Sequence, residues 1–364
     1  MSEARDQILE ATTQLLGPLL TGMDMLGHAG RHLHPPNLPD LVDAVTPFRQ
    51  PLAEALERFE RIDWPPHLAD FHDYLHDSAN FTLQGYDGLA TCATDANPII
   101  GAYRSMRFNT RAMEALYPVA AMLPPVSRFF LDDLHREDGA LLDRLAGSDA
   151  SQPDRGVVHA GNGPDDRGGF SLYVPEYYDG EAEWPLVIAL HGGSGHGRDF
   201  LWTWLREARS SGVFLVSATS RDRTWSLMGP DKDSANLNAM IEHVATTCRL
   251  DRSRILLTGM SDGGTFTMLS GLLGGVPATH LAPISSAFHP VLLQGAKPER
   301  LSDLPVYLTH GALDWMFAID GARVAQQALR DAGAKVEYRE IEDLSHTYPR
   351  EENTRILNWF LSAT

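Results

Sequence analysis

Residues 254–264 read RILLTGMSDGG, an apolar run that ends in the pattern Gly-x-Ser-x-Gly around Ser261. The run before the serine predicts a buried strand, and the apolar residues 265–273 after it predict a helix. A serine on so sharp a turn projects its hydroxyl out of the sheet, and Gly259 and Gly263 relieve the crowding that the turn creates. The pattern also arises by chance as a turn of small residues, so its weight comes from the strand and helix that flank it.

Two candidate partners for Ser261 follow it along the chain. A serine hydroxyl is a weak nucleophile and needs a base within hydrogen-bond reach, together with an acid that orients this base. The segment LPVYLTHGALD predicts a strand followed by Asp314, and KVEYREIEDLSH predicts a strand followed by His346. Both residues lie beyond the carboxyl end of a strand, where open α/β sheets build their sites. We therefore predict a catalytic triad of these three residues, with Asp320 and Asp343 as rival acids.

A glycine-rich segment, LVIALHGGSGHG at 186–197, predicts a loop that binds an oxyanion. Glycines let the backbone approach a ligand closely. The predicted N–H donors are Gly193, with Ser194 as its alternative, and Asp262, the residue after the nucleophile. A phosphate-binding loop is the other interpretation, but the segment holds neither Gly-x-Gly-x-x-Gly nor a Walker lysine.

The four segments LHGGSG, GMSDGG, HGALD and LSH resemble those of the α/β-hydrolases. Residues from about 157 to 364 are similar to the esterase, phospholipase/carboxylesterase and polyhydroxyalkanoate-depolymerase-like branches of that superfamily. The resemblance implies an α/β-hydrolase fold and ester hydrolysis through an acyl-enzyme, with no cofactor and no metal. It sets the chain apart from the dienelactone hydrolase branch, which has cysteine at the position of Ser261.

The chain has two differently patterned parts. Residues 1–147 show apolar side chains at helical spacing and several prolines, which predicts an all-helical N-terminal domain. The small and polar residues 148–156 predict a linker. From 157 to 364 strand and helix patterns alternate, which predicts a mostly parallel sheet, with the strands near 157 and 170 paired antiparallel at its edge. For the helical domain, a cap over the site, dimerisation and docking of a partner stay open.

Composition limits the partners. Lys and Arg number 30 against 48 Asp and Glu, a formal net charge of −18, which disfavours nucleic acid and anionic membranes and favours neutral substrates. With the resemblance given above, this implies a small-molecule ester as the substrate. No apolar stretch is long enough for a membrane span. The N-terminus lacks signal-peptide features, and the two cysteines, Cys92 and Cys248, predict no disulfide framework, so we expect a cytoplasmic location. A homo-oligomer stays open.

Pocket and metal candidates are weaker. The candidate pocket residues Trp225, Trp315 and Phe317, with Met228 and Met316, follow predicted strands, and core packing is the competing interpretation. The chain also holds a set of histidines in its first part: His28, His32, His34, His67, His72 and His76. No His-Glu-x-x-His pattern accompanies them, so we predict no metal site.

The triad admits more than one activity. Ester hydrolysis is the primary hypothesis, because the four segments occur together and in the expected order. A peptidase or an acyltransferase uses the same triad, and a catalytically inactive binding protein is the alternative from another class.

Overall fold

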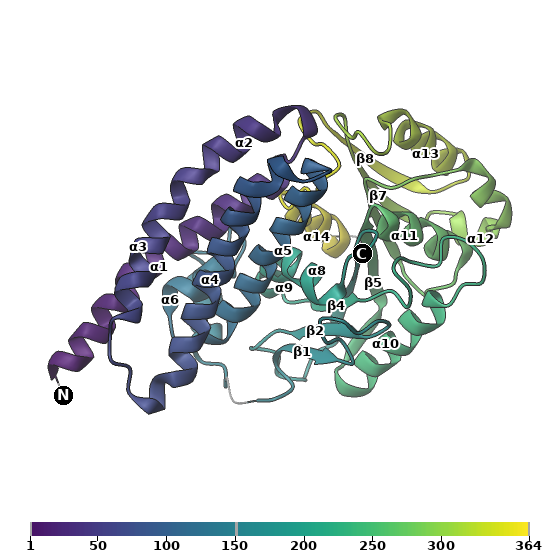
Figure 1. Ribbon diagram of the computed structural model, residues 1–364. Helices are drawn as coiled ribbons and strands as arrows, with labels where there is room; N and C mark the ends of the chain where they lie inside the picture. The colour runs from purple at the N-terminus through teal and green to yellow at the C-terminus, as the bar shows by residue number, and fades with distance from the viewer. Residues whose placement is uncertain (1, 150–151, 363–364) are drawn as a thin grey trace. The chain divides into compact units, whose positions relative to one another are not determined.

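The computed structural model describes residues 2–149 and 152–362. The chain divides into two compact units, one ending at Phe130 and one beginning at Leu131 (Figure 1). Each unit is considered by itself.

The first unit is helical, as predicted. Its apolar residues at helical spacing are buried: Leu15 and Leu19 in α1, and Leu56 and Phe59 in α3. Gly88 of α4 lies directly against Ser105 of α5, where a Cβ atom on the glycine would clash with the serine side chain, so the glycine lets these two helices pack closely. Its α-helices are α1 (Ser2–His32), α2 (Leu38–Val45), α3 (Arg49–Glu60), α4 (Ala69–Thr91), α5 (Pro98–Leu116) and α6 (Pro124–Phe129). Short 3-10 helices connect them: η1 (Pro35–Asn37), η2 (Thr46–Phe48), η3 (Pro66–Leu68), η4 (Cys92–Thr94) and η5 (Tyr117–Val119).

The second unit contains an eight-stranded sheet in the order β1-β2-β4-β3-β5-β6-β7-β8 (Figure 1). Strands β3 to β8 are parallel, whereas β1 and β2 form an antiparallel edge, as predicted. The strands are β1 (Gly156–Ala160), β2 (Phe170–Val174), β3 (Trp184–Leu190), β4 (Phe214–Ala218), β5 (Leu250–Met260), β6 (His280–Ile284), β7 (Pro305–Gly311) and β8 (Lys335–Ile341).

Helices connect the parallel strands and bury the sheet. In β3 every residue from Leu186 to Leu190 is buried, which is typical of a strand covered on both faces. The predicted α/β fold is therefore confirmed. The helices of this unit are α7 (Gly139–Ala146), α8 (Gly197–Phe200), η6 (Leu201–Thr203), α9 (Leu205–Ser211), α10 (Asp233–Thr247), α11 (Asp262–Leu273), η7 (Pro290–Gly295), α12 (Pro298–Leu301), α13 (Ile319–Asp331) and α14 (Glu352–Ser362).

The division between the units falls earlier than the predicted linker at 148–156. Leu131, with Leu141 and Leu145 from α7, forms a small apolar cluster against Tyr177 of the second unit. Helical spacing shows that α7 has an apolar face, but it does not show which core that face covers. Residues 150 and 151 of the predicted linker lie outside the described residues.

One property concerns membranes. Among residues 2–149 and 152–362, none of the helices combines the length and the apolar character needed to cross a bilayer.

Candidate active site

Ser261 occupies the sharp turn between β5 and α11. Its φ of 55° and ψ of −119° are rare for a residue with a side chain, and such strain costs on the order of 1–3 kcal/mol. The N–H of Ser261 donates to the carbonyl oxygen of Ile284 at 2.9 Å, which holds the strained residue against the neighbouring strand β6. The turn thus fixes the direction of the serine side chain.

The glycines around Ser261 are required by close backbone packing. A Cβ atom at Gly263 would lie 2.3 Å from the carbonyl oxygen of Leu190, and one at Gly259 would lie 2.6 Å from the carbonyl carbon of Gly263. Contacts this short do not occur for real Cβ atoms. The two glycines of the Gly-x-Ser-x-Gly pattern therefore relieve crowding at the turn, and they let α11 start directly against the end of β3.

The structure brings the three predicted triad residues together. His346 Nε2 lies 3.0 Å from Ser261 Oγ, and His346 Nδ1 lies 2.8 Å from Asp314 Oδ2. All three side chains are buried. Asp314 follows β7 and His346 follows β8, so the carboxyl ends of two neighbouring strands position the acid and the base.

Asp314 is held as a carboxylate. Burial alone would raise its pKa, but hydrogen bonds from His346 and from the N–H of Phe317, the charge of His346 and the N–H of Met316 outweigh burial and lower the pKa below its usual value. The two N–H groups meet Oδ1 at 2.8 and 2.9 Å, so Oδ2 is left to face the imidazole.

The rival acids lie elsewhere. Asp320 is exposed in the first turn of α13 and pairs with Arg323 at 3.0 Å, and Asp343 is exposed. Neither of them is the carboxylate that meets His346 Nδ1.

The predicted oxyanion donors differ in their availability. The N–H of Ser194 donates to the carbonyl oxygen of Arg223 at 2.9 Å, so this alternative donor is already engaged. The N–H of Gly193 makes no such bond in the part of the chain that the structure describes. Asp262 begins α11, and an N–H in the first turn of a helix has no acceptor within that helix. Of the predicted donors, Gly193 and Asp262 therefore remain the candidates for binding an oxyanion.

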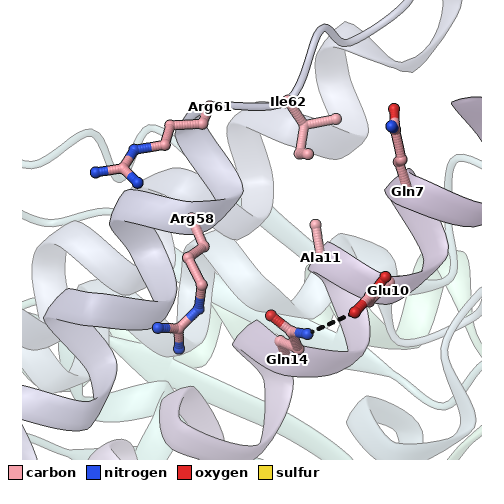
Figure 2. Close-up of a pocket in the computed structure, with 7 residues that line it drawn as sticks. All are labelled: Gln7, Glu10, Ala11, Gln14, Arg58, Arg61 and Ile62. Carbon is pink, nitrogen blue, oxygen red and sulfur yellow. Dashed lines mark hydrogen bonds between the residues drawn. The ribbon is translucent and has the colours of Figure 1, made fainter.

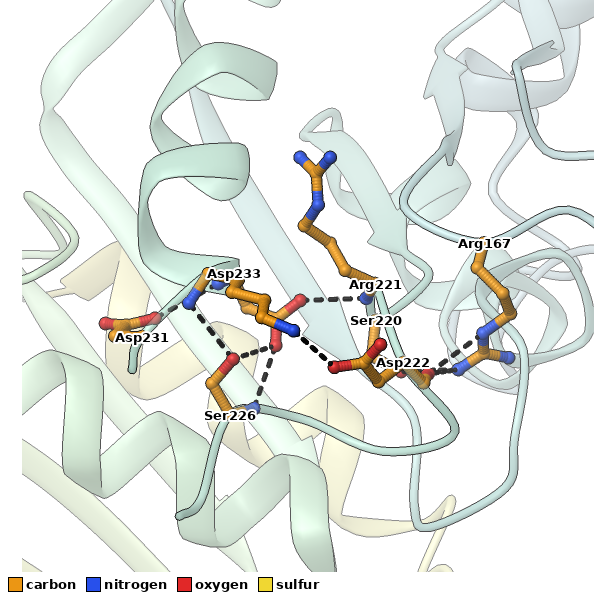
Figure 3. A network of polar contacts seen from close by, with 8 residues as sticks. Arg167, Ser220, Arg221, Asp222, Ser226, Asp231 and Asp233 are labelled. Atoms are coloured by element: carbon orange, nitrogen blue, oxygen red, sulfur yellow. Dashed lines mark hydrogen bonds and ion pairs between the residues drawn. The ribbon is translucent and has the colours of Figure 1, made fainter. Parts of the chain in front are cut away.

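Contacts from two other segments hold the glycine-rich loop and the first residue of α11. Arg167 donates to the carbonyl oxygen of Asp222 at 3.0 Å (Figure 3). It also donates to the carbonyl oxygen of Gly195 at 2.8 Å. His191 Nε2 lies 3.1 Å from the N–H of Ser220, and burial lowers the pKa of His191 to about 3. Thr224 donates to the carboxylate of Asp262 at 2.5 Å. None of Arg167, His191 and Thr224 was singled out from the sequence, because contacts between loops leave no periodic signal.

The candidate pocket residues separate into two groups. Trp225 is only 3% exposed, its indole N–H donates to the carbonyl oxygen of His191 at 2.7 Å, and its ring stacks on Phe266. It is a core residue, so core packing was the better interpretation for this tryptophan. Trp315, in contrast, is 42% exposed beside the buried Asp314. Phe317 meets the imidazole of His346 edge-on, with ring centroids 5.3 Å apart.

A shallow pocket of about 250 Å³ lies within the helical unit (Figure 2). It holds none of the predicted catalytic residues. Gln14 donates to Glu10 there at 3.0 Å. The lining residues are Gln7, Glu10, Ala11, Gln14, Arg58, Arg61 and Ile62.

The histidines of the helical unit make contacts of other kinds. His72 and His76 stack on one face of α4, and His76 Nε2 lies 3.1 Å from Glu60. Over the described ranges, no group of three His, Cys, Asp or Glu side chains is arranged to hold a metal ion.

The mostly parallel sheet and the serine on its strand-to-helix turn show that the second unit has the α/β-hydrolase fold. Residues 220–364 match the model of a family described as Phospholipase/Carboxylesterase. The resemblance to the α/β-hydrolase esterases that the motifs indicated is confirmed, and the phospholipase/carboxylesterase branch is the one that the family model supports.

The chain shares limited sequence identity with the following proteins. The chain is 26% identical over 111 residues to carboxylesterase SOBER1 of Arabidopsis thaliana, covering 29% of this chain and 46% of that protein. It thus spans about half the length of the curated relative that it matches. Among solved structures, a thermostable esterase is similar with a TM-score of 0.46 and 21% identity, over 56% of this chain and 62% of the other. FphF of Staphylococcus aureus, a fluorophosphonate-binding serine hydrolase, is similar with a TM-score of 0.46 and 13% identity, over 57% of this chain and 97% of the other.

Proposed function

We propose that the protein hydrolyses carboxylic esters through an acyl-enzyme formed on Ser261. The observation that carries the proposal is the position of His346, whose two ring nitrogens meet Ser261 Oγ at 3.0 Å and Asp314 Oδ2 at 2.8 Å. An imidazole held in this way has one nitrogen for the serine proton and one fixed on the acid, which sets its tautomer.

The first half of the reaction transfers the acyl group to the enzyme. Ser261 Oγ attacks the carbonyl carbon while His346 Nε2 takes the hydroxyl proton. The negative charge moves to the carbonyl oxygen, where the N–H groups of Gly193 and Asp262 stabilise it. The bond to the leaving alcohol then breaks, and His346 gives that alcohol the proton.

The second half releases the acid. Water donates a proton to His346 Nε2 as its oxygen attacks the acyl carbon, and the same two N–H groups stabilise the second oxyanion. The bond to Ser261 Oγ breaks, and His346 returns the proton to the serine. Asp314 stays ionised throughout, in keeping with the lowered pKa of its carboxyl group.

We also propose that the segment after Asp314 contacts the apolar part of the ester. Trp315 and Met316 expose large apolar side chains directly beside the acid, and Phe317 touches the imidazole of the base. An acyl or alkyl group that enters the site would cover these side chains and remove them from water, which favours binding.

Replacement of the nucleophile tests the proposal. Ser261→Ala should lower kcat on short-chain p-nitrophenyl esters by a factor of about 10⁴ or more, while circular dichroism and the melting temperature report an intact fold. Ser270→Ala, a matched control in α11, should retain turnover. Turnover by folded Ser261→Ala within tenfold of the wild type would overturn the proposal, and a panel of amides and acyl acceptors decides between hydrolase, peptidase and acyltransferase.

A further inference from the structure

A second imidazole lies against the carboxylate of Asp314. His310 is the last residue but one of β7 and is completely buried. It shares a face of the strand with Val306 and Leu308, which belong to the main apolar core. A polar ring at such a position costs folding free energy unless its nitrogens are hydrogen-bonded, so its presence calls for a physical reason.

The hydrogen bond of His310 shows which of its two ring nitrogens carries the proton. Its Nε2 lies 2.8 Å from the carbonyl oxygen of Phe317, and a carbonyl oxygen only accepts. The proton is therefore on Nε2. The same atom is 3.4 Å from Asp314 Oδ2, the oxygen that also meets His346. The His310 N–H thus points between the carbonyl oxygen of Phe317 and the carboxylate of Asp314.

The other nitrogen of His310 finds no partner. In the part of the chain covered by the structure, nothing donates to or accepts from its Nδ1, which is buried. A buried imidazole with one hydrogen-bonded nitrogen and one unpaired nitrogen contributes little to the stability of the fold. The engaged nitrogen is the one that faces the Asp314 turn, which points to that turn as the reason for the histidine.

The turn from Asp314 to Phe317 connects this ring to both partners of the serine. The N–H of Phe317 donates to Asp314 Oδ1, its carbonyl accepts from His310, and its ring packs edge-on against His346. Loss of the His310 N–H would leave the carbonyl of Phe317 without its hydrogen bond. The turn would then hold less firmly both the Asp314 carboxylate and the Phe317 ring that packs against His346.

We propose that His310 is a positioning residue of the active site, which holds the Asp314–Phe317 turn so that Oδ2 of the acid faces His346. The inference rests on the proposed ester hydrolysis and adds a fourth side chain to it. His310 touches neither the substrate nor the reacting serine in this role, and it acts through Asp314 and Phe317.

Two substitutions at position 310 separate positioning from mere packing. His310→Gln retains an N–H donor near the place of Nε2, whereas His310→Leu retains the apolar bulk and has no donor. We expect His310→Leu to lower kcat by a factor of about 10–100 with KM changed less than threefold, because an oriented group is displaced while binding contacts remain. His310→Gln should recover most of that loss.

His280 supplies the matched control. It is also a buried histidine of the same sheet, it lies on β6, and its Nε2 has no partner among the described residues. It begins its strand, at the opposite end from the triad, and its ring packs on Trp359 and Phe360. His280→Leu should therefore leave kcat within about twofold of the wild type.

Two outcomes would overturn the inference: an unchanged kcat in His310→Leu, or equal losses in His310→Leu and His310→Gln. If His310→Leu fails to fold, ¹⁵N spectra of the histidine rings in the wild-type protein decide instead. They should show His310 with its proton on Nε2, and a proton on Nδ1 alone would contradict the role. Failure of the ester hydrolase proposal itself is recognised separately, by activity that survives Ser261→Ala.

Discussion

A Cβ atom on Gly193 would lie 2.6 Å from Oδ2 of Asp262. The glycine-rich loop after β3 therefore lies so close to the Asp262 side chain that a side chain at position 193 would force either the loop or this carboxylate, which accepts from Thr224, to move. Because Gly193 and Asp262 carry the N–H groups available to an oxyanion, their spacing is part of the proposed site.

Gly193→Ala should lower kcat by a factor of about 10–1,000, because the added methyl group meets the Asp262 carboxylate and the shift that relieves this contact disturbs the two residues that carry the proposed oxyanion donors. Steady-state kinetics on a p-nitrophenyl ester measures the effect. Gly321→Ala is the control, because a Cβ there meets no atom within 4 Å and its position is helical. Equal kcat values for Gly193→Ala and the wild type would show that this loop does not bind the oxyanion.

Asp314→Asn should lower kcat by a factor of about 10²–10⁴, because an amide can present an N–H to His346 Nδ1 and so favour the wrong tautomer. The rivals Asp320→Asn and Asp343→Asn should stay within about threefold of the wild type, since both side chains are exposed. A loss in either rival that matches the loss in Asp314→Asn would reassign the acid.

The proximity of Ser261, Asp314 and His346 could be predicted because each of the three residues has a local sequence signal. Ser261 stands in a pattern of glycines that a strand-to-helix turn requires, and Asp314 and His346 each follow an apolar run that forms a parallel strand. The carboxyl ends of neighbouring parallel strands meet at one rim, so chain order and strand ends were sufficient to bring them together.

Other parts of the site depend on contacts between distant residues, which leave no signal in the local sequence. The engaged N–H of Ser194 depends on the carbonyl of Arg223, and the burial of Trp225 depends on Phe266 and His191. In the same way, the apolar face of α7 does not reveal which unit it joins. His310 did leave a trace, as a polar residue inside the run LPVYLTHG, but its role became visible only with the turn that folds back over it.

The two tryptophans beside the site should respond differently to removal. Trp225→Ala should lower the free energy of unfolding by about 3–5 kcal/mol, because a buried indole is lost from the core. Trp315→Ala should change it by less than about 1 kcal/mol and instead lower kcat/KM for longer-chain esters by a factor of about 3–10 relative to acetate esters. Urea unfolding and an acyl-chain series measure both. A chain-length profile unaltered by Trp315→Ala would exclude this residue from the substrate pocket.

His191 should make the protein sensitive to acid. Burial lowers its pKa from 6.5 to about 3, so between these values the unfolded chain binds a proton that the folded protein does not. The contribution of neutral, buried His191 to the free energy of unfolding is therefore fully present above pH 6.5. It is lost as the pH falls toward 3, at about 1.4 kcal/mol per pH unit. The free energy of unfolding of His191→Gln should depend less steeply on pH between 6 and 4. An equal slope in the variant and the wild type would mean that His191 titrates normally in the folded state.

Reaction with a fluorophosphonate probe, followed by peptide mapping, tests the central claim most directly, because only an activated serine reacts rapidly. The account predicts that the label is found on Ser261, and that His346→Ala slows labelling by a factor of about 100 or more while the protein stays folded. Folded wild-type protein that fails to react, or a label carried by another serine, would contradict it.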